Sequence, residues 1–140
     1  MAFSKFLDSK RQDCKALVSE LKKTFAYVSV LGVDIKTTGI RVDRNTSNIG
    51  PGQDTECGFV VKMHNGTVFC EYSLDDIQGD IQALAAKIRA AFRVHASLME
   101  DTIEPVLLPD APLVQSFSRE HDRSDHSDNE LLTFVKQQAK

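Results

Sequence analysis

The sequence lacks several features that mark whole classes of protein. It has no run of about 18 apolar residues, which would be needed for a membrane-spanning helix, and its N-terminus, MAFSKFLDSKRQDCK, has no apolar segment like that of a secretory signal peptide. Its three cysteines, Cys14, Cys57 and Cys70, are few and widely spaced, which favours reduced thiols over a disulfide framework. These absences predict a cytoplasmic protein that has no membrane partner.

An excess of one charge is also missing. The chain has 17 Lys and Arg against 20 Asp and Glu, for a formal net charge of −3, and its basic residues are scattered. A nucleic-acid-binding surface needs clustered basic residues, so we predict no nucleic-acid partner. With 140 residues, of which 41% are hydrophobic, the chain is long enough to bury one core.

Catalytic motifs are absent as well: the sequence has no HExxH, CxxC or GxSxG and no glycine-rich phosphate loop. His121 and His126 lie in an acidic stretch, SREHDRSDHSDNE, but are five residues apart, whereas zinc-binding pairs on helices prefer a spacing of three or four. We therefore predict a solvated loop that binds no metal. We expect His64 to be exposed at a strand end, His95 to lie at a helix end, and the three cysteines to fill core positions. The chain is thus predicted to have no catalytic residue, no metal ligand and no cofactor.

Apolar periodicity divides the first half of the chain. Steps of three and four predict an amphipathic helix over residues 3–24. Alternation over residues 27–35 predicts a strand, followed by a turn near Thr38 and Gly39 and a second strand through Val42. Residues 45–54, rich in Gly, Pro, Asn and Ser, are predicted to form a loop.

The clearest local signal is the pair Asn65-Gly66 between two alternating runs, which predicts a hairpin with a type I′ turn. That register places Lys62 opposite Phe69. One face of the hairpin should be buried, and its residues are Phe59, Val61, Met63, Val68, Cys70 and Tyr72. The other face is mixed and carries Val60, Lys62, His64, Thr67, Phe69 and Glu71. We expect four of these, Val60, Lys62, Phe69 and Glu71, to form an interface.

The second half begins with a predicted helix. Ser73 and Asp76 resemble a capping box, and the helix that would follow from Asp75 has one apolar face: Ile77, Ile81, Leu84, Ala85, Ile88 and Phe92. Prolines make residues 101–128 a connector. A second capping box, Ser127 with Glu130, opens a further helix over 129–140, and because the sequence stops inside it we expect a truncated chain.

These elements together predict an α+β fold. An antiparallel sheet of about four strands would be flanked by two amphipathic helices within a domain over residues 1–100, followed by the C-terminal connector and a short helix.

The order of these elements resembles the N-terminal domain of the TldD/PmbA family over roughly residues 10–95. The resemblance rests on YVSVLGVDI after the first helix and on GFVVKMHNGTVFCEYSLDDIQGDIQALAAKIRAAF. Within it, Gly58 precedes the first hairpin strand, Asn65-Gly66 forms the turn, Phe69 is the aromatic of the return strand, and Ser73-Leu74 precedes an Ala-rich helix. The sequence departs from the family in having Lys62 where arginine is favoured, and in an insertion around residues 50–52.

The resemblance implies a zinc-dependent peptidase that acts on unfolded peptides and whose HExxxH motif and zinc lie in a C-terminal domain. This chain has no HExxxH, so it would be a non-catalytic domain that contributes to dimer assembly and to the substrate passage. Its partners would be its own C-terminal domain, a second subunit and the peptide substrate. The alternative is a stand-alone protein-interaction or assembly module without enzymatic activity.

Overall fold

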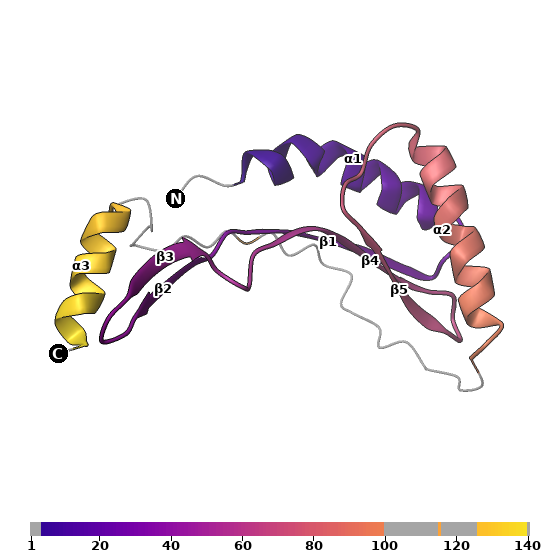
Figure 1. Cartoon of the computed structure of the whole chain (residues 1–140). Coiled ribbons are helices and arrows are strands. Elements are labelled where there is room, and N and C mark those ends of the chain that lie inside the picture. The colour runs from indigo at the N-terminus through magenta and orange to yellow at the C-terminus, as the bar shows by residue number, and fades with distance from the viewer. Residues whose placement is uncertain (1–3, 100–114, 116–125, 140) are drawn as a thin grey trace. The chain divides into compact units, whose positions relative to one another are not determined.

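The computed structural model describes residues 4–99, 115 and 126–139. Three helices and five strands confirm the α+β class (Figure 1). The chain divides into two compact units. We call them the helix–sheet unit, which contains α1, β1, β4, β5 and α2, and the hairpin unit, which contains β2, β3 and α3. No helix in the described ranges is long and apolar enough to cross a membrane.

The first helix, α1 (Lys5–Leu21), begins where Ser4 caps it: the Ser4 hydroxyl accepts a hydrogen bond from the backbone N–H of Leu7 at 3.1 Å. Its apolar face buries Leu17 and Leu21 completely. At its N-terminal end the helix lies close to β1 (Tyr27–Ile35), because a side chain on Gly32 would come within 2.9 Å of Leu7. The missing Cβ of Gly32 therefore lets α1 pack directly onto the strand.

A three-stranded sheet, in the order β1-β4-β5, forms the base of the helix–sheet unit. The antiparallel pair β4 (Glu56–His64) and β5 (Phe69–Leu74) buries alternate residues against the helices. Val61 is fully buried and Lys62 is not, which confirms the predicted buried face. This face also contributes Phe59, Met63 and Cys70 to the core, while Val68 and Tyr72 pack at its margin.

The predicted register of this hairpin is wrong by two residues, since Lys62 pairs with Glu71 and not with Phe69. The central turn residues are Gly66 and Thr67, one position later than predicted. The Asn65 side-chain oxygen accepts hydrogen bonds from the N–H groups of Thr67 at 2.9 Å and Val68 at 2.8 Å. Of Asn65 and Gly66, the two residues predicted to form the turn, only Gly66 has a positive φ, 105°. Because side chains alternate with a period of two, the shift changes every partner but no face.

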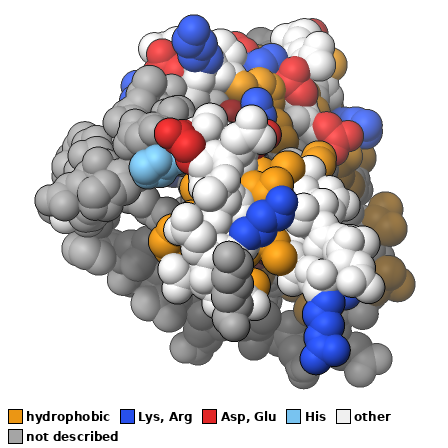
Figure 2. All heavy atoms as spheres, turned by 60° about the vertical axis from the view of Figure 1, so that its left-hand side comes forward, with side chains coloured by type: hydrophobic (Ala, Val, Ile, Leu, Met, Phe, Trp, Pro, Cys, Tyr) orange, Lys and Arg blue, Asp and Glu red, His pale blue; other side chains and the backbone are white. Residues whose placement is uncertain are grey.

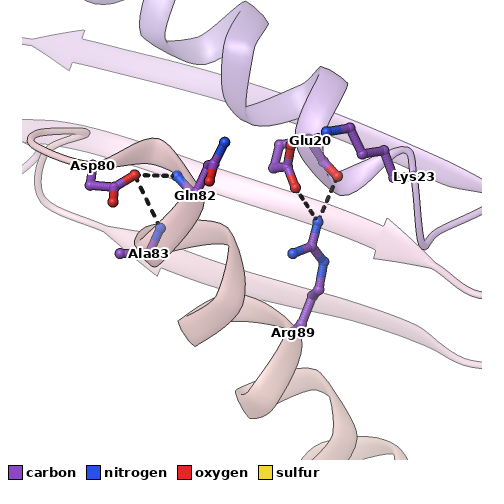
Figure 3. Close-up of polar contacts among 6 residues, drawn as sticks. All are labelled: Glu20, Lys23, Asp80, Gln82, Ala83 and Arg89. Carbon is purple, nitrogen blue, oxygen red and sulfur yellow. Dashed lines mark hydrogen bonds and ion pairs between the residues drawn. The ribbon is translucent and has the colours of Figure 1, made fainter.

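The second helix, α2 (Ile81–Ala96), begins six residues later than predicted, because Asp80 is its N-cap. The Asp80 carboxylate accepts from the N–H of Gln82 at 2.8 Å and of Ala83 at 3.3 Å (Figure 3). Gly79, with φ of 76°, turns the chain into the helix in a conformation that favours glycine. Ile77 is buried as predicted, although it lies in the preceding loop.

Packing and two polar contacts join the helices and the loop before α2. Phe25 packs against Phe92 in a tilted arrangement, with ring centroids 4.6 Å apart and an interplanar angle of 60°. The Lys10 ammonium binds the Asp76 carboxylate at 2.8 Å and the Ile77 carbonyl oxygen at 2.9 Å, which ties α1 to the loop before α2. The core of the unit therefore lies between the two helices and one face of the sheet.

In the hairpin unit, β2 (Thr38–Val42) pairs antiparallel with β3 (Ser47–Pro51). Two predictions are wrong here: Thr38 and Gly39 lie within β2, and the predicted loop 45–54 contains β3. The turn lies between β2 and β3, where the Asp43 N–H donates to the Thr46 carbonyl oxygen at 2.8 Å. The strand β3 was not predicted because its sequence, SNIGP, contains Gly and Pro, which are depleted in strands.

The last helix, α3 (Asp128–Gln138), contacts β2 and β3. Its predicted capping box is confirmed: the Ser127 N–H donates to the Glu130 carboxylate at 2.7 Å, and the Glu130 N–H donates to the Ser127 hydroxyl at 3.3 Å. Most of the predicted connector 101–128 lies outside the described residues.

Candidate functional site

The face of the sheet that points away from α1 and α2 holds the predicted interface residues, and we call it the open sheet face. Val28 and Val30 of β1 and Phe59 and Val61 of β4 pack toward the helices, so the residues that alternate with them point the other way. The open sheet face comprises Tyr27, Ser29, Leu31, Val33, Ile35, Val60, Lys62, His64, Phe69 and Glu71.

Lys62 and Glu71 form an ion pair at the centre of this face. They are direct partners in the β4–β5 ladder, and Lys62 Nζ lies 2.8 Å from Glu71 Oε1. The hydrogen bond to Glu71, reinforced by the attraction between the charges, raises the pKa of Lys62 above its ordinary value. Their side chains remain 39% and 48% exposed, so both charged groups are available to a partner that approaches the sheet.

Apolar side chains of β4, β5 and β1 share this face with the ion pair. Val60 and Phe69 are each half-buried. On β1, Leu31 is 53% exposed and Ile35 is 46% exposed. The open sheet face therefore combines one ion pair with several partly exposed apolar side chains.

His64 belongs to the same face but is buried, at 3% exposure, so the prediction of an exposed strand-end histidine is wrong. Its Nδ1 accepts a hydrogen bond from the Gly66 N–H at 2.8 Å. A ring nitrogen that accepts has no proton, so the ring proton is on Nε2. His64 therefore helps to hold the hairpin turn, which accounts for its burial beside a loop.

The three thiols are free, as predicted. Cys70 is buried and Cys14 is half-buried, and burial is the main cause that raises the pKa of each thiol above its ordinary value of 9.0. A raised pKa keeps a thiol protonated and poorly nucleophilic. Cys57 is exposed, which corrects the prediction that all three occupy core positions.

The remaining histidines are dispersed. His95 is exposed in the last turn of α2, as predicted, and His126 is exposed just before α3. His121 lies outside the described residues, so the loop prediction for 118–128 stays a prediction. Among the described residues, no group of three or more His, Cys, Asp or Glu side chains could hold a metal ion.

A small crevice of about 170 Å³ opens between β5 and α2, lined by Met63, Cys70, Glu71, Tyr72, Ala91, Phe92 and His95. Its lining mixes apolar and polar side chains from β4, β5 and α2. On the face shown in Figure 2, acidic and basic side chains lie interspersed among hydrophobic ones.

Comparison of the chain with protein-family models, with curated proteins and with solved structures gives no match.

The sequence located the four candidate residues on the correct face but missed two contributions to the surface. It did not predict the Lys62–Glu71 ion pair, because the turn was placed one residue early. It also left the β1 residues Leu31 and Ile35 out of the surface, although their alternation with Val28 and Val30 was a usable signal.

Proposed function

We propose that this chain is the non-catalytic N-terminal domain of a cytoplasmic TldD/PmbA-like zinc-dependent peptidase that acts on unfolded peptides. In this proposal the open sheet face packs on the C-terminal domain of the same protein or on a second subunit, and so helps to form the substrate passage. The zinc and its ligands belong to the C-terminal domain, because the sequence of this chain has no HExxxH motif.

The observation that carries the proposal is the arrangement of the residues on which the resemblance rests. Gly58 enters the hairpin with φ of 149°, and a Cβ there would lie 2.8 Å from the Leu74 carbonyl oxygen. Glycine is therefore favoured at position 58, which lies inside β4 and not before the strand as the resemblance expects. Gly66 turns the same hairpin, and the Ala-rich α2 follows it and packs on β5.

The open sheet face supports the assembly role. One side of the sheet forms the core with both helices, whereas the other has a partly exposed ion pair, four half-buried apolar or aromatic side chains and two exposed apolar ones. Such a face buries more apolar area when another layer covers it, which is the common arrangement for sheets in multidomain chains.

The test is to place Val60→Glu and Phe69→Glu together in the native, full-length protein. The matched control is Ala83→Glu with Ala90→Glu, at two exposed positions of α2. We expect the first pair to weaken assembly or cleavage of an unstructured peptide at least about tenfold, with unchanged circular dichroism, and the control pair to leave both unchanged. Unchanged assembly and cleavage in the first pair would contradict the proposal.

A further inference from the structure

The turn between β4 and β5 contains two groups that can react with each other. Asn65 is followed directly by Gly66, and both residues are exposed. In such a pair the backbone nitrogen of the glycine can attack the side-chain carbonyl carbon of the asparagine, because glycine has no side chain that hinders the approach. This reaction closes a succinimide ring and releases ammonia. The turn therefore holds both the nucleophile and the acyl group of an intramolecular acyl transfer.

Hydrogen bonds position both groups. The Gly66 N–H donates to Nδ1 of His64 at 2.8 Å. The Asn65 side-chain oxygen, Oδ1, accepts from the N–H groups of Thr67 at 2.9 Å and Val68 at 2.8 Å. The Asn65 side chain thus folds back along the turn, toward the nitrogen that would attack its Cγ. A base on the proton of the nucleophile and N–H donors on the carbonyl oxygen are the two aids that acyl transfer needs.

We propose that this turn deamidates itself, with His64 as the base. Nδ1 of His64 takes the proton of the Gly66 nitrogen as this nitrogen bonds to Cγ of Asn65. The negative charge that develops on Oδ1 is stabilised by the N–H groups of Thr67 and Val68. The bond between Cγ and Nδ2 then breaks, and Nδ2 leaves as ammonia with the proton that His64 returns to it. Water then opens the succinimide to aspartate or isoaspartate.

The surroundings of the turn suit each step. His64 is 3% exposed, so its ring is held in place with Nδ1 directed at the Gly66 N–H, and the 2.8 Å distance is within the reach that a base requires. A Cβ on Gly66 would meet nothing within 4 Å, so the space beside the attacking nitrogen is open. Asn65 is exposed, which gives water access to the succinimide.

The two products should affect the hairpin differently. Aspartate at position 65 keeps an oxygen that can accept from the N–H groups of Thr67 and Val68, and its charge strengthens those bonds. Isoaspartate adds a methylene group to the backbone, which should loosen the pairing of His64 with Phe69 at the end of the ladder. Both of these residues belong to the open sheet face, so the reaction would slowly change that face. The reaction needs only the hairpin and does not depend on the peptidase proposal.

The first test compares the 140-residue chain with the peptide of residues 63–69, which contains His64, Asn65 and Gly66 but is too short to form a stable hairpin. Mass spectrometry at neutral pH follows the conversion of the Asn65 amide to a carboxyl group, and chromatography separates the isoaspartate product. Because the base is positioned only in the fold, we expect the folded chain to react at least about tenfold faster than the peptide. An equal or slower rate in the folded chain would show that the hydrogen bonds only protect the turn, and would overturn the proposal.

The second test separates the base from a merely structural role of His64. His64→Gln keeps a side-chain oxygen that can accept from the Gly66 N–H but is not basic, and His64→Phe removes the acceptor. We expect both variants to react at least about tenfold more slowly than the wild type. The matched control, His95→Phe at an exposed position of α2, should react at the wild-type rate.

Circular dichroism shows which variants fold, and a folded His64→Gln that reacts as fast as the wild type would contradict the role of His64 as the base. If neither His64 variant folds, the comparison of the wild-type chain with the peptide decides.

Discussion

Arg89 of α2 donates two hydrogen bonds to Glu20 of α1, one to its backbone carbonyl oxygen at 2.7 Å and one to its carboxylate at 2.9 Å (Figure 3). The contact joins the C-terminal end of α1 to the middle of α2. The Lys10–Asp76 contact joins the other end of α1 to the loop before α2. The two contacts therefore hold α1 against α2 and against the loop that precedes it.

The first prediction concerns the pH dependence of stability. Hydrogen bonds from Lys23 and then from Arg89 lower the pKa of Glu20 below its ordinary value of 4.5. A lowered pKa in the folded state stabilises the fold above the ordinary value, and this contribution is lost as the pH falls through the lowered one. Glu20→Gln should therefore be less stable than the wild type at neutral pH and lose less stability on acidification below 4.5. Urea unfolding at a series of pH values measures both effects, and parallel acid profiles for the two proteins would contradict the assignment.

The second prediction concerns the buried face of the hairpin. Val61 is fully buried among apolar side chains, so Val61→Asp places an unpaired charge in the core. We expect the free energy of unfolding to fall by about 4 kcal/mol or more. Val94→Asp, at a 65% exposed position of α2, should change it by less than about 1 kcal/mol. Equal effects in chemical denaturation would show that the assignment of faces is wrong.

The third prediction concerns Gly58. Because of its φ of 149° and the nearby Leu74 carbonyl, Gly58→Ala should cost about 1–3 kcal/mol of stability. Gly50→Ala is the control: nothing lies within 4 Å of its Cβ position and its φ is not positive. It should be neutral or slightly stabilising. Thermal unfolding of both variants distinguishes them, and a harmless Gly58→Ala would remove the structural reason for glycine at this point of the resemblance.

The sequence predicted best where one strong local signal agreed with burial. The alternation around Val61 identified the buried face, and Ser127 with Glu130 identified the start of α3. It failed where two local solutions compete. Asn65 and Gly66 can be the two central residues of the turn, or the Asn65 side chain can accept hydrogen bonds from the N–H groups of a turn centred one residue later. The structure has the second arrangement.

Other failures arose where tertiary contacts decide the structure. Ser73 and Asp76 resembled a capping box for α2, but Asp76 pairs with Lys10 of α1, and the helix begins after Asp80 instead. β3 contains Gly50 and Pro51 and forms because β2 pairs with it. His64 was predicted to be exposed because it is polar, but it is buried, and its Nδ1 accepts a hydrogen bond from the Gly66 N–H. The Lys10–Asp76 contact joins two distant segments, so it cannot be predicted from either segment alone.

The most direct measurement for the proposed function is the intact mass and zinc content of the native protein, purified through an antibody against this domain. The account predicts a polypeptide substantially longer than 140 residues that carries stoichiometric zinc, while the isolated 140-residue chain carries none. A native polypeptide that ends at Lys140 and carries no zinc would contradict it, and the open sheet face would then belong to a stand-alone interaction module.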